Sequence, residues 1–407
     1  MPTPAPHKQP HQTQWEKVKL GDIAEIKNGS TPSTTESSNF GGDIVWITPK
    51  DLSNQKSKYI YTSNSKITKK GYKSCSTTML PLHTICLTSR APIGLIGISK
   101  VELCTNQGFK NIIVNDKKCF YEYLYYFLTL RKNDLQALGS GTKFKELNTI
   151  TLTQYQIPLP PLPTQENIAQ ILSTLDKKIE LNTRINTELE SMAKLLYTRY
   201  FVEFNFPDSS GKPYKASGGA MVYSPTLKRE IPQDWEVASL NDICHLYQPK
   251  TIAEKDLIQN GKYFVYGANG IIGRYDKYNH EESEIVITCR GASCGNILRT
   301  IPQVWITGNA MVASPKNKKI HKQFIKNTLE VIGIKNTITG SAQPQITREN
   351  LKGLYVAVPN DELLEKYFST INPIYEIFIK NQQESQRLAE WRDYLLPLLM
   401  GDQVEVV

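Results

Sequence analysis

The sequence predicts an α+β fold with two pseudo-symmetric, mixed α/β globular domains separated by two long antiparallel helices. The first observation is an internal repeat, because WEKVKLGDI at Trp15 returns as WEVASLNDI at Trp235. The second is that repeated features keep their order, since TSR at 88–90 returns as TCR at 288–290. The third is that a long heptad-patterned segment follows each copy. The chain therefore reads as domain, helix, domain, helix.

These features divide the chain into six expected parts. They are a polar, proline-rich disordered tail (1–14), a first globular domain (15–160), a central helical region (161–206), a linker rich in Gly, Ser and Pro (207–234), a second globular domain (235–359) and a C-terminal helical region (360–407).

Short apolar runs rich in β-branched residues predict strands in each domain. In the first domain they lie at 44–48, 84–89 and 111–114, and a single helical stretch is expected at 120–138. The second domain repeats the order with FVYG, EIVITC and QVWIT, followed by HKQFIKNTLEVIG as its helix. Each domain is therefore expected to mix strands and helix.

The two helical regions carry one heptad pattern. An offset of 196 residues converts the first set into the second: Ile168, Leu172, Leu175, Ile179, Asn182, Asn186, Leu189, Ala193, Leu196 and Tyr200 become Leu364, Phe368, Ile371, Tyr375, Phe378, Gln382, Ser385, Ala389, Arg392 and Leu396. We expect the two helices to pack antiparallel on each other. The alternative is that each helix covers only its own domain.

A helix boundary is expected inside each helical region. Asp176 and Asn372 occupy equivalent positions and are good N-cap residues, and Pro373 would then fall at the first helical position. A short helix would end near 175 and near 371, and a long helix of roughly 29 residues would follow each.

Charge and cysteine usage limit the classes of function. The net charge is +9 with 21% charged residues, which favours an anionic partner, nucleic acid ahead of membrane, over a purely solubilising surface. The seven cysteines form no CxxC pair, the histidines are dispersed, and no apolar run reaches membrane-spanning length. We therefore expect no metal site, no membrane span and a cytoplasmic protein.

Catalytic motifs are missing from the sequence. It contains no GxxxxGK[ST], GxSxG or HExxH. The segment Asn372-Pro373-Ile374-Tyr375 is close to the Asn-Pro-Pro-Tyr motif of amino-methyltransferases, but it lacks the second proline and no glycine-rich donor loop precedes it. A binding protein is favoured over an enzyme.

Three segments resemble the specificity subunit of type I restriction-modification systems. They are IPLPPLPTQENIAQILSTLDKKIELN (157–182), FPDSSGKPYKASGGAMVYSPTLKREIPQDWE (206–236) and RLAEWRDYLLPLLMGD (387–402). The resemblance spans nearly the whole chain except the tail, and in the globular domains it is one of pattern only. It implies two target recognition domains separated by two conserved helical regions.

The resemblance also implies partners and a division of labour. This chain would be the non-catalytic subunit that reads a bipartite site in double-stranded DNA. Two methyltransferase (modification) subunits would dock on its helices, and motor-nuclease (restriction) subunits would join for restriction. Adenine would be methylated with S-adenosylmethionine bound by the methyltransferase, and the complex would be cytoplasmic.

Loops at equivalent positions supply the candidate DNA-facing residues. An arginine after a strand-ending threonine suits a phosphate or a guanine edge, while lysine and glutamine in the later loop suit phosphate and adenine. The candidates are Arg90, Arg290, Lys143, Lys145, Gln343 and Gln345, and then Lys27, Lys50, Arg274 and Tyr275. The alternatives are arginines paired with carboxylates and ordinary solvated loops.

Two other functions compete with this hypothesis. A self-contained DNA adenine methyltransferase would need a donor loop and a complete base-binding motif. A helical adaptor that binds only proteins would account for the helices but not for the two variable domains.

Overall fold

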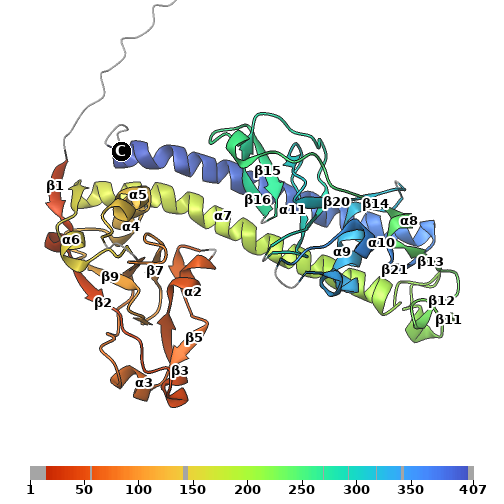
Figure 1. Ribbon diagram of the computed structural model, residues 1–407, viewed down its shortest axis with the longest axis horizontal. Coiled ribbons are helices and arrows are strands. Elements are labelled where there is room, and N and C mark those ends of the chain that lie inside the picture. Colours follow the sequence, from red (N-terminus) through yellow and green to blue (C-terminus); the bar gives the residue numbers. More distant parts are fainter. Residues whose placement is uncertain are drawn as a thin grey trace, which may run out of the picture. The chain divides into compact units, whose positions relative to one another are not determined.

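The computed structural model describes residues 15–401, apart from 56, 141–144, 269, 292, 318 and 341–342. The chain forms two compact units: unit 1 comprises Met1–Leu181 and Ser385–Val407, and unit 2 comprises Asn182–Glu384 (Figure 1). Each unit therefore contains one globular domain and a part of each helical region. The predicted tail and Lys143 lie outside the described residues.

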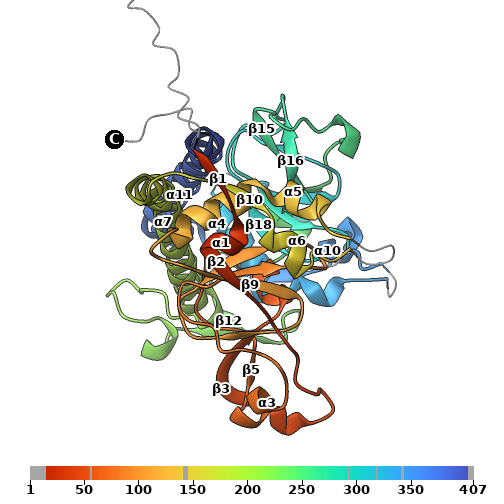
Figure 2. The same cartoon turned by 90° about the vertical axis from the view of Figure 1, so that its left-hand side faces the viewer.

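Unit 1 contains three sheets within its described residues. The strand orders are β2-β9-β6-β7-β4, β5-β3-β8 and β1-β10. Figure 2 shows β2 beside β9 and β3 beside β5. The strands are β1 (Glu16–Lys19), β2 (Ala24–Asn28), β3 (Phe40–Ile47), β4 (Tyr59–Ile60), β5 (Ser65–Ile67), β6 (Ile85–Thr88), β7 (Ile96–Ser99), β8 (Cys104–Thr105), β9 (Phe109–Val114) and β10 (Gln156–Leu159). The predicted runs at 44–48, 84–89 and 111–114 fall on β3, β6 and β9.

Unit 2 repeats the topology of unit 1. Its orders β14-β20-β17-β18, β16-β15-β19 and β13-β21 correspond to those of unit 1, except that within the described residues the first sheet has no counterpart of β4. The parallel pairing of β15 with β19 corresponds to that of β3 with β8. The strands are β13 (Glu236–Ser239), β14 (Cys244–Tyr247), β15 (Tyr263–Gly267), β16 (Gly270–Tyr275), β17 (Ile285–Thr288), β18 (Ile297–Arg299), β19 (Trp305–Ile306), β20 (Ala310–Pro315) and β21 (Tyr355–Val358). The predicted duplication is confirmed.

Each domain has one main helix whose apolar face enters the core. Tyr123 of α4 (Tyr121–Leu130) and Phe324 of α9 (Lys322–Ile332) are fully buried at equivalent positions. The single helix expected at 120–138 is instead two helices, because α4 ends at Leu130, the backbone of Arg131 leaves the helical conformation, and α5 (Lys132–Ala137) follows. The shorter helices are α1 (Leu20–Ile23), α2 (Pro49–Ser53), α3 (Lys69–Lys73), α6 (Thr149–Thr153), α8 (Leu240–Ile243) and α10 (Arg348–Lys352).

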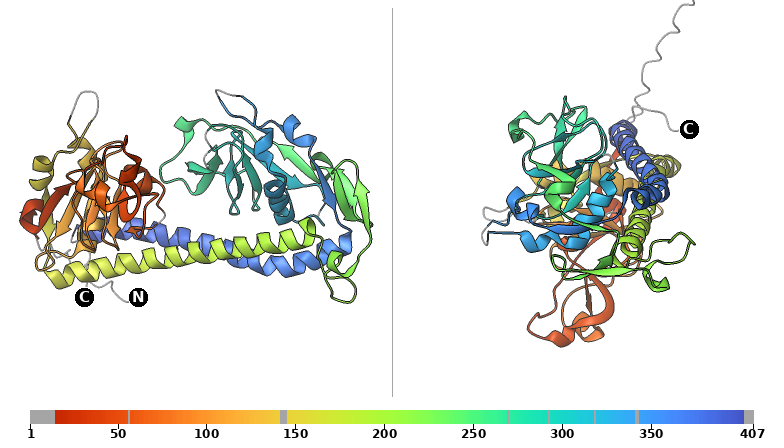
Figure 3. Two further views of the ribbon diagram at one scale, coloured as in Figure 1. Left: turned by 90° about the horizontal axis from the view of Figure 1, so that it is seen from below. Right: turned by 90° about the vertical axis from the view of Figure 1, so that its right-hand side faces the viewer.

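The long helices are uninterrupted, so the boundary predicted inside each helical region is wrong. Helix α7 runs Leu162–Tyr197 and α11 runs Asp361–Met400, each as one continuous helix (Figure 3). Asn372 and Pro373 lie in the interior of α11. A proline inside a helix costs about 3 kcal/mol. Burial of Ile371, Tyr375 and Phe378 along the seam on either side outweighs that cost.

The helices pack antiparallel, as predicted. In unit 2, Asn182 donates a hydrogen bond to Glu384 (2.8 Å), and Asn381 donates to Asn186 (2.9 Å). The residue number rises on α7 as it falls on α11, which defines the direction. The predicted heptad positions are buried or half-buried in both helices, so the seam is confirmed.

The end of α11 belongs to the core of unit 1. Leu396, Leu399 and Met400 are buried in one cluster with Leu172 of α7, and Trp15 packs against that cluster. The start of the first domain and the end of the second helix are therefore neighbours in one hydrophobic core.

The segment expected to be a linker, 207–234, is packed against the second domain. Phe206 stacks on Trp235 at 5.6 Å and on Tyr214 at 4.7 Å between ring centroids. The hairpin of β11 (Met221–Ser224) and β12 (Arg229–Pro232) follows, and Ile231 is buried. Aromatic burial thus orders a segment whose composition is that of a flexible connection.

Candidate nucleic-acid interface

A hydrogen-bonded loop follows β6 in the first domain and presents Arg90. The hydroxyl of Thr88, the last residue of the strand, donates to the carbonyl of Pro92 (2.6 Å) and accepts from the N–H of Leu95 (2.9 Å). The Gly94 N–H donates to the carbonyl of Thr88 (3.1 Å). One threonine therefore fixes both ends of the loop, and Arg90 stands half-exposed within it.

The same loop follows β17 in the second domain. The Thr288 hydroxyl accepts from the N–H of Asn296 (3.1 Å), and the Gly295 N–H donates to the carbonyl of Thr288 (2.9 Å). Arg290 is exposed in this loop. The two arginines predicted from the repeat therefore occupy equivalent, similarly supported positions.

A second loop packs beside the first in each domain. The Leu147 N–H donates to the carbonyl of Ser89 (2.9 Å), and the Ile346 N–H donates to the carbonyl of Cys289 (3.0 Å). Backbone bridges join Ser140 to Glu146 in one domain. In the other they join Gln345 to both Thr339 and Arg290. The second loop carries Lys145 in the first domain and Gln343 and Gln345 in the second, and all three are exposed.

In the first domain the two loops surround a cavity. Its volume is about 750 Å³, and it is lined by Arg90, Ala91, Pro92, Ile93, Gln136, Lys145 and Glu146. The predicted pair Arg90 and Lys145 thus meets at one site. These two side chains are cationic and Glu146 is the one anionic residue of the lining, so the net charge of the lining is positive and the opening suits an anionic ligand such as a DNA phosphate.

Lys110 is a third cation near this site, and sequence reasoning missed it. Its ammonium donates to Asn28 Oδ1 (2.9 Å) and lies 3.8 Å from Glu146 Oε1. Burial lowers the pKa of Lys110, Glu146 opposes that shift, and the positive charge of Arg90 lowers the pKa further. A lysine within the apolar strand FKNIIV was the available signal, and its counterpart in the second domain is Met311.

Lys27 and Lys50, the other predicted residues of the first domain that the structure describes, are sequence neighbours of residues that contact the Arg90 loop or Lys110. Lys27 precedes Asn28 on β2 and is ion-paired with Glu25. Lys50 is exposed on α2 and follows Pro49, which packs against Gly108. The Gly108 carbonyl accepts from the N–H of Ser89 (2.8 Å), which precedes Arg90.

Arg274 and Tyr275 are not brought to the Arg290 loop. The Arg290 loop contacts the β15–β16 hairpin at its turn, where Ser293 donates to the carbonyl of Ala268. Arg274 and Tyr275 lie at the opposite end of the hairpin, roughly 15 Å along the strands. Arg274 donates to the carbonyl of Gly261 (3.1 Å), and the ring of Tyr275 packs on Trp305 at 5.3 Å.

The methyltransferase-like tetrapeptide does not form a base-binding pocket. Asn372 is exposed on α11 and donates to Glu376 (3.0 Å), whereas Tyr375 is buried with the guanidinium of Arg299 4.8 Å from its ring centroid. Asn372 therefore forms a hydrogen bond within its own helix, and Tyr375 is part of the hydrophobic core. Across residues 15–401, apart from the undescribed positions, no cluster of His, Cys, Asp and Glu suits a metal, and no helix could span a membrane.

Comparison with known proteins identifies the family. The model of the type I restriction modification DNA specificity domain matches residues 12–191 and again 232–389. The chain belongs to the type I restriction-modification specificity subunits. The two matches coincide with the two copies of the internal repeat. Each repeat of this specificity subunit is therefore one specificity domain.

Relatives of the specificity subunit cover almost its whole length. The MjaIX specificity subunit of Methanocaldococcus jannaschii is 32% identical over 96% of this chain and 94% of its own. The EcoprrI specificity subunit of Escherichia coli is 24% identical over 90% of each chain. The crystal structure of a type I S subunit from M. genitalium has the same fold, with a TM-score of 0.58 and 16% identity over 96% of this chain and 97% of that one.

Family membership decides between the three functions considered from the sequence. Specificity subunits are the non-catalytic, DNA-recognition components of restriction-modification complexes, so this chain is a DNA-binding subunit and not an enzyme. The self-contained methyltransferase and the protein-only adaptor receive no support from these matches.

Proposed function

We propose that each globular domain reads one half of a bipartite DNA site through its pair of hydrogen-bonded loops. The observation that carries the proposal is the repetition of one loop pair in both domains, with an arginine after the strand-ending threonine each time. Residues held at equivalent places on equivalent scaffolds suit two half-sites, as in dimeric DNA readers.

The two loop pairs carry different chemistry, which suits different half-sites. The first domain offers Arg90 and Lys145, with Lys143, Lys27 and Lys50 as further cations for phosphates or guanine. The second offers Arg290 with Gln343 and Gln345, whose amides suit adenine. Arg274 and Tyr275 support the hairpin in this proposal and do not read bases.

The long helices supply a surface for protein partners. Trp391 (63% exposed) and Tyr394 (69% exposed) lie three residues apart on α11, and therefore on one helix face. Helix α7 exposes Leu181, Ile185, Met192 and Leu195. Exposed aromatic and apolar side chains in such numbers are typical of protein interfaces. Two methyltransferase subunits would dock here, and motor-nuclease subunits would join them.

The reaction itself belongs to the partners in this proposal. Methylation of adenine would use S-adenosylmethionine held by the methyltransferase subunit, and the complex would act in the cytoplasm. This chain would position the methyltransferase on the DNA, and so determine which adenine is methylated.

Two matched substitutions test the proposal. Arg90→Ala should relax or weaken recognition of one half-site by about 1–3 kcal/mol, and Arg290→Ala should do the same for the other half-site. Arg199→Ala is the control, because Arg199 is exposed just beyond α7 and outside both domains. Methylated positions mapped genome-wide would show the effect. Unchanged patterns in both variants would refute the assignment of the loops.

A further inference from the structure

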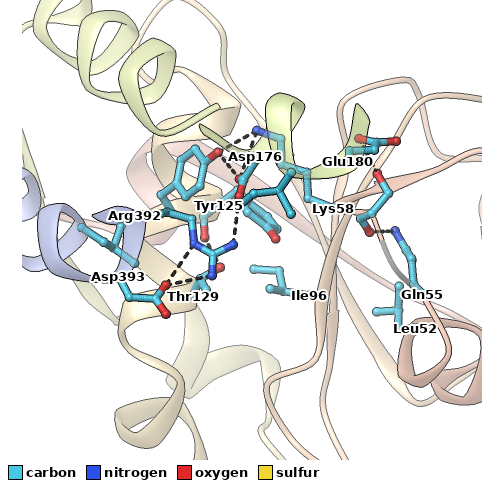
Figure 4. A pocket seen from close by; sticks show the side chains of 14 residues that line it. Leu52, Gln55, Lys58, Ile96, Tyr125, Thr129, Asp176, Glu180, Arg392 and Asp393 are labelled. Atoms are coloured by element: carbon cyan, nitrogen blue, oxygen red, sulfur yellow. Dashed lines mark hydrogen bonds and ion pairs between the residues drawn. The ribbon is translucent and has the colours of Figure 1, made fainter. Parts of the chain in front are cut away.

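A cluster of charged residues joins the first domain to the two helices inside unit 1. It surrounds a cavity of about 320 Å³ whose lining includes Lys58, Tyr126, Asp176 and Arg392. Figure 4 shows Lys58, Asp176 and Arg392 at this cavity. Lys58 and Tyr126 come from the domain, Asp176 from α7 and Arg392 from α11. Three separate parts of the chain therefore meet through polar side chains.

Asp176 is the residue that contacts all the others. Its Oδ1 accepts from Arg392 Nη1 (2.9 Å), and its Oδ2 accepts from the Tyr126 hydroxyl (2.5 Å). The Lys58 ammonium lies 3.9 Å from Oδ2 and also donates to the Tyr126 hydroxyl (2.8 Å). One carboxylate therefore links the domain to both helices.

The lysine end of the cluster is shielded from water, whereas the side chain of Arg392 is 31% exposed at its edge. The side chain of Lys58 is 5% exposed, and that of its second partner, Glu122, is 9% exposed. Burial lowers the pKa of Lys58, while Glu122 and Asp176 oppose that shift. Burial also disfavours the charge of Arg392, but hydrogen bonds from Arg392 to Asp176 and Asp393 outweigh it and raise the pKa of this guanidinium. Ion pairs in such surroundings are directional and hard to replace with water.

The second domain rests on the helices with different chemistry. The residues equivalent to Glu122 and Tyr126 are Gln323 and Asn327, which hydrogen-bond to each other (2.8 Å). Asn327 continues to the hydroxyl of Tyr367 on α11 (3.4 Å). The residue equivalent to Asp176 is Asn372, which is exposed and bonded within its own helix. The second domain forms its ion pairs with the helices at other positions, from Lys326 to Glu190 on α7 (3.2 Å) and from Lys319 to Asp361 on α11. Among the described residues, a single carboxylate that bonds to a domain residue and to the opposite helix at this heptad position is therefore found at Asp176 in unit 1.

We infer that Asp176 is a positioning residue that fixes the orientation of the first recognition domain on the helix pair, and so the accuracy with which that domain reads its half-site. A cavity lies beside the cluster, so close packing alone does not hold the domain at this place. Directional hydrogen bonds to one carboxylate supply the missing constraint. The inference rests on the proposed division of half-sites between the domains.

The test uses the full-length chain in complex with its methyltransferase partner and a duplex library randomised in both half-sites. Asp176→Asn keeps the size of the side chain and removes its charge, and Tyr126→Phe removes one hydrogen bond as a milder second variant. We expect discrimination in the half-site of the first domain to fall roughly threefold to thirtyfold for Asp176→Asn, and less for Tyr126→Phe. Discrimination in the other half-site should stay within about twofold.

The matched control is Asn372→Ala, at the equivalent exposed position of α11, which should change neither half-site. Arg90→Ala identifies which half-site belongs to the first domain. If Arg90→Ala alters no half-site, the proposed function fails on its own. Two results would overturn the role of Asp176 when Arg90→Ala does alter one half-site. They are equal losses of discrimination in both half-sites, and no loss for Asp176→Asn or Tyr126→Phe.

Discussion

Asn381 donates a hydrogen bond to Asn186 across the helix pair, with 2.9 Å between Nδ2 and Oδ1. Asn186 in turn donates to the carbonyl of Phe378 (3.1 Å), and Asn182 donates to Glu384 (2.8 Å). These amide groups therefore form a polar layer across the middle of the seam. Such layers fix the register of paired helices at a cost in stability.

The polar layer predicts a non-additive pair of substitutions. Asn186→Leu alone should lower the free energy of unfolding by about 1–3 kcal/mol, because it leaves a half-buried amide unpaired. Asn186→Leu with Asn381→Leu should recover most of that loss, since both polar partners are then removed. Chemical denaturation of the four proteins in the cycle measures the coupling, with exposed Lys194→Ala as control. Strict additivity would contradict a direct interaction.

The same layer defines where the helices can be lengthened together. One heptad inserted between Asn186 and Thr187 and another between Lys380 and Asn381 would keep the seam in register. The insertion adds about 10 Å, or about three base pairs of DNA. We expect the preferred spacer between half-sites to grow by roughly two to four pairs.

Affinity should fall in the lengthened protein, because three base pairs also rotate the second half-site by roughly 100° about the DNA axis. Selection from a library with spacers of random length, using the complex, measures both effects. An unchanged spacer at undiminished affinity would show that the helices do not set the distance.

His321 predicts a pH dependence of stability in unit 2. It caps α9, where its Nδ1 accepts from the N–H of Gln323 (3.3 Å). Burial, followed by the charges of Arg299 and Lys322, lowers its pKa to about 4. Because the unfolded residue titrates near pH 6.5, the unfolded state binds the proton first as pH falls. Stability should therefore fall by up to about 1.4 kcal/mol per pH unit between about pH 6.5 and 4.

The variant His321→Asn separates this effect from general acid sensitivity. Asparagine keeps an N-cap acceptor and cannot titrate in this range. Urea unfolding at pH 7 and pH 5 should show a smaller difference for the variant than for the native protein. Equal differences would show that another group causes the acid sensitivity.

Trp15 and Met400 belong to one hydrophobic core, which predicts that the protein tolerates circular permutation. Joining residues 1 and 407 and opening the chain between Ser210 and Gly211, which are exposed, should preserve folding and DNA binding. A second opening, between Ile287 and Thr288 inside β17, is the control and should abolish soluble protein. Loss of binding in the first permutant would contradict the proximity of the two ends.

The sequence alone predicted the features that repeat. The apolar runs that form strands, the heptad seam and the segments TSR and TCR that carry Arg90 and Arg290 each occur twice in the sequence, so each copy supports the prediction made from the other. It failed where tertiary contacts decide. Asp176 is a residue type that often caps helices, but it lies inside α7. Its carboxylate bonds to Tyr126 and Arg392 instead of to the backbone at a helix start.

Unrepeated features were harder to predict. Lys110 lies beside Asn28 and Glu146 only because β9 pairs with β2, a register that no local pattern specifies. Arg274 is among the further DNA-facing candidates from the sequence, whereas the register of the β15–β16 hairpin places it at the end away from the Arg290 loop. The roles of Lys143, Lys145, Gln343 and Gln345 toward DNA stay predictions.

The arrangement of the chain in the two units has a consequence for synthesis on the ribosome. Unit 2 is one uninterrupted stretch, 182–384, whereas unit 1 needs residues from both ends of the chain. Leu396, Leu399 and Met400 complete its core, and they emerge only after all of unit 2. At typical elongation rates the intervening residues take roughly 10 to 40 s to synthesise. The first domain to leave the ribosome is therefore the last to be finished, and it waits with part of its apolar surface uncovered.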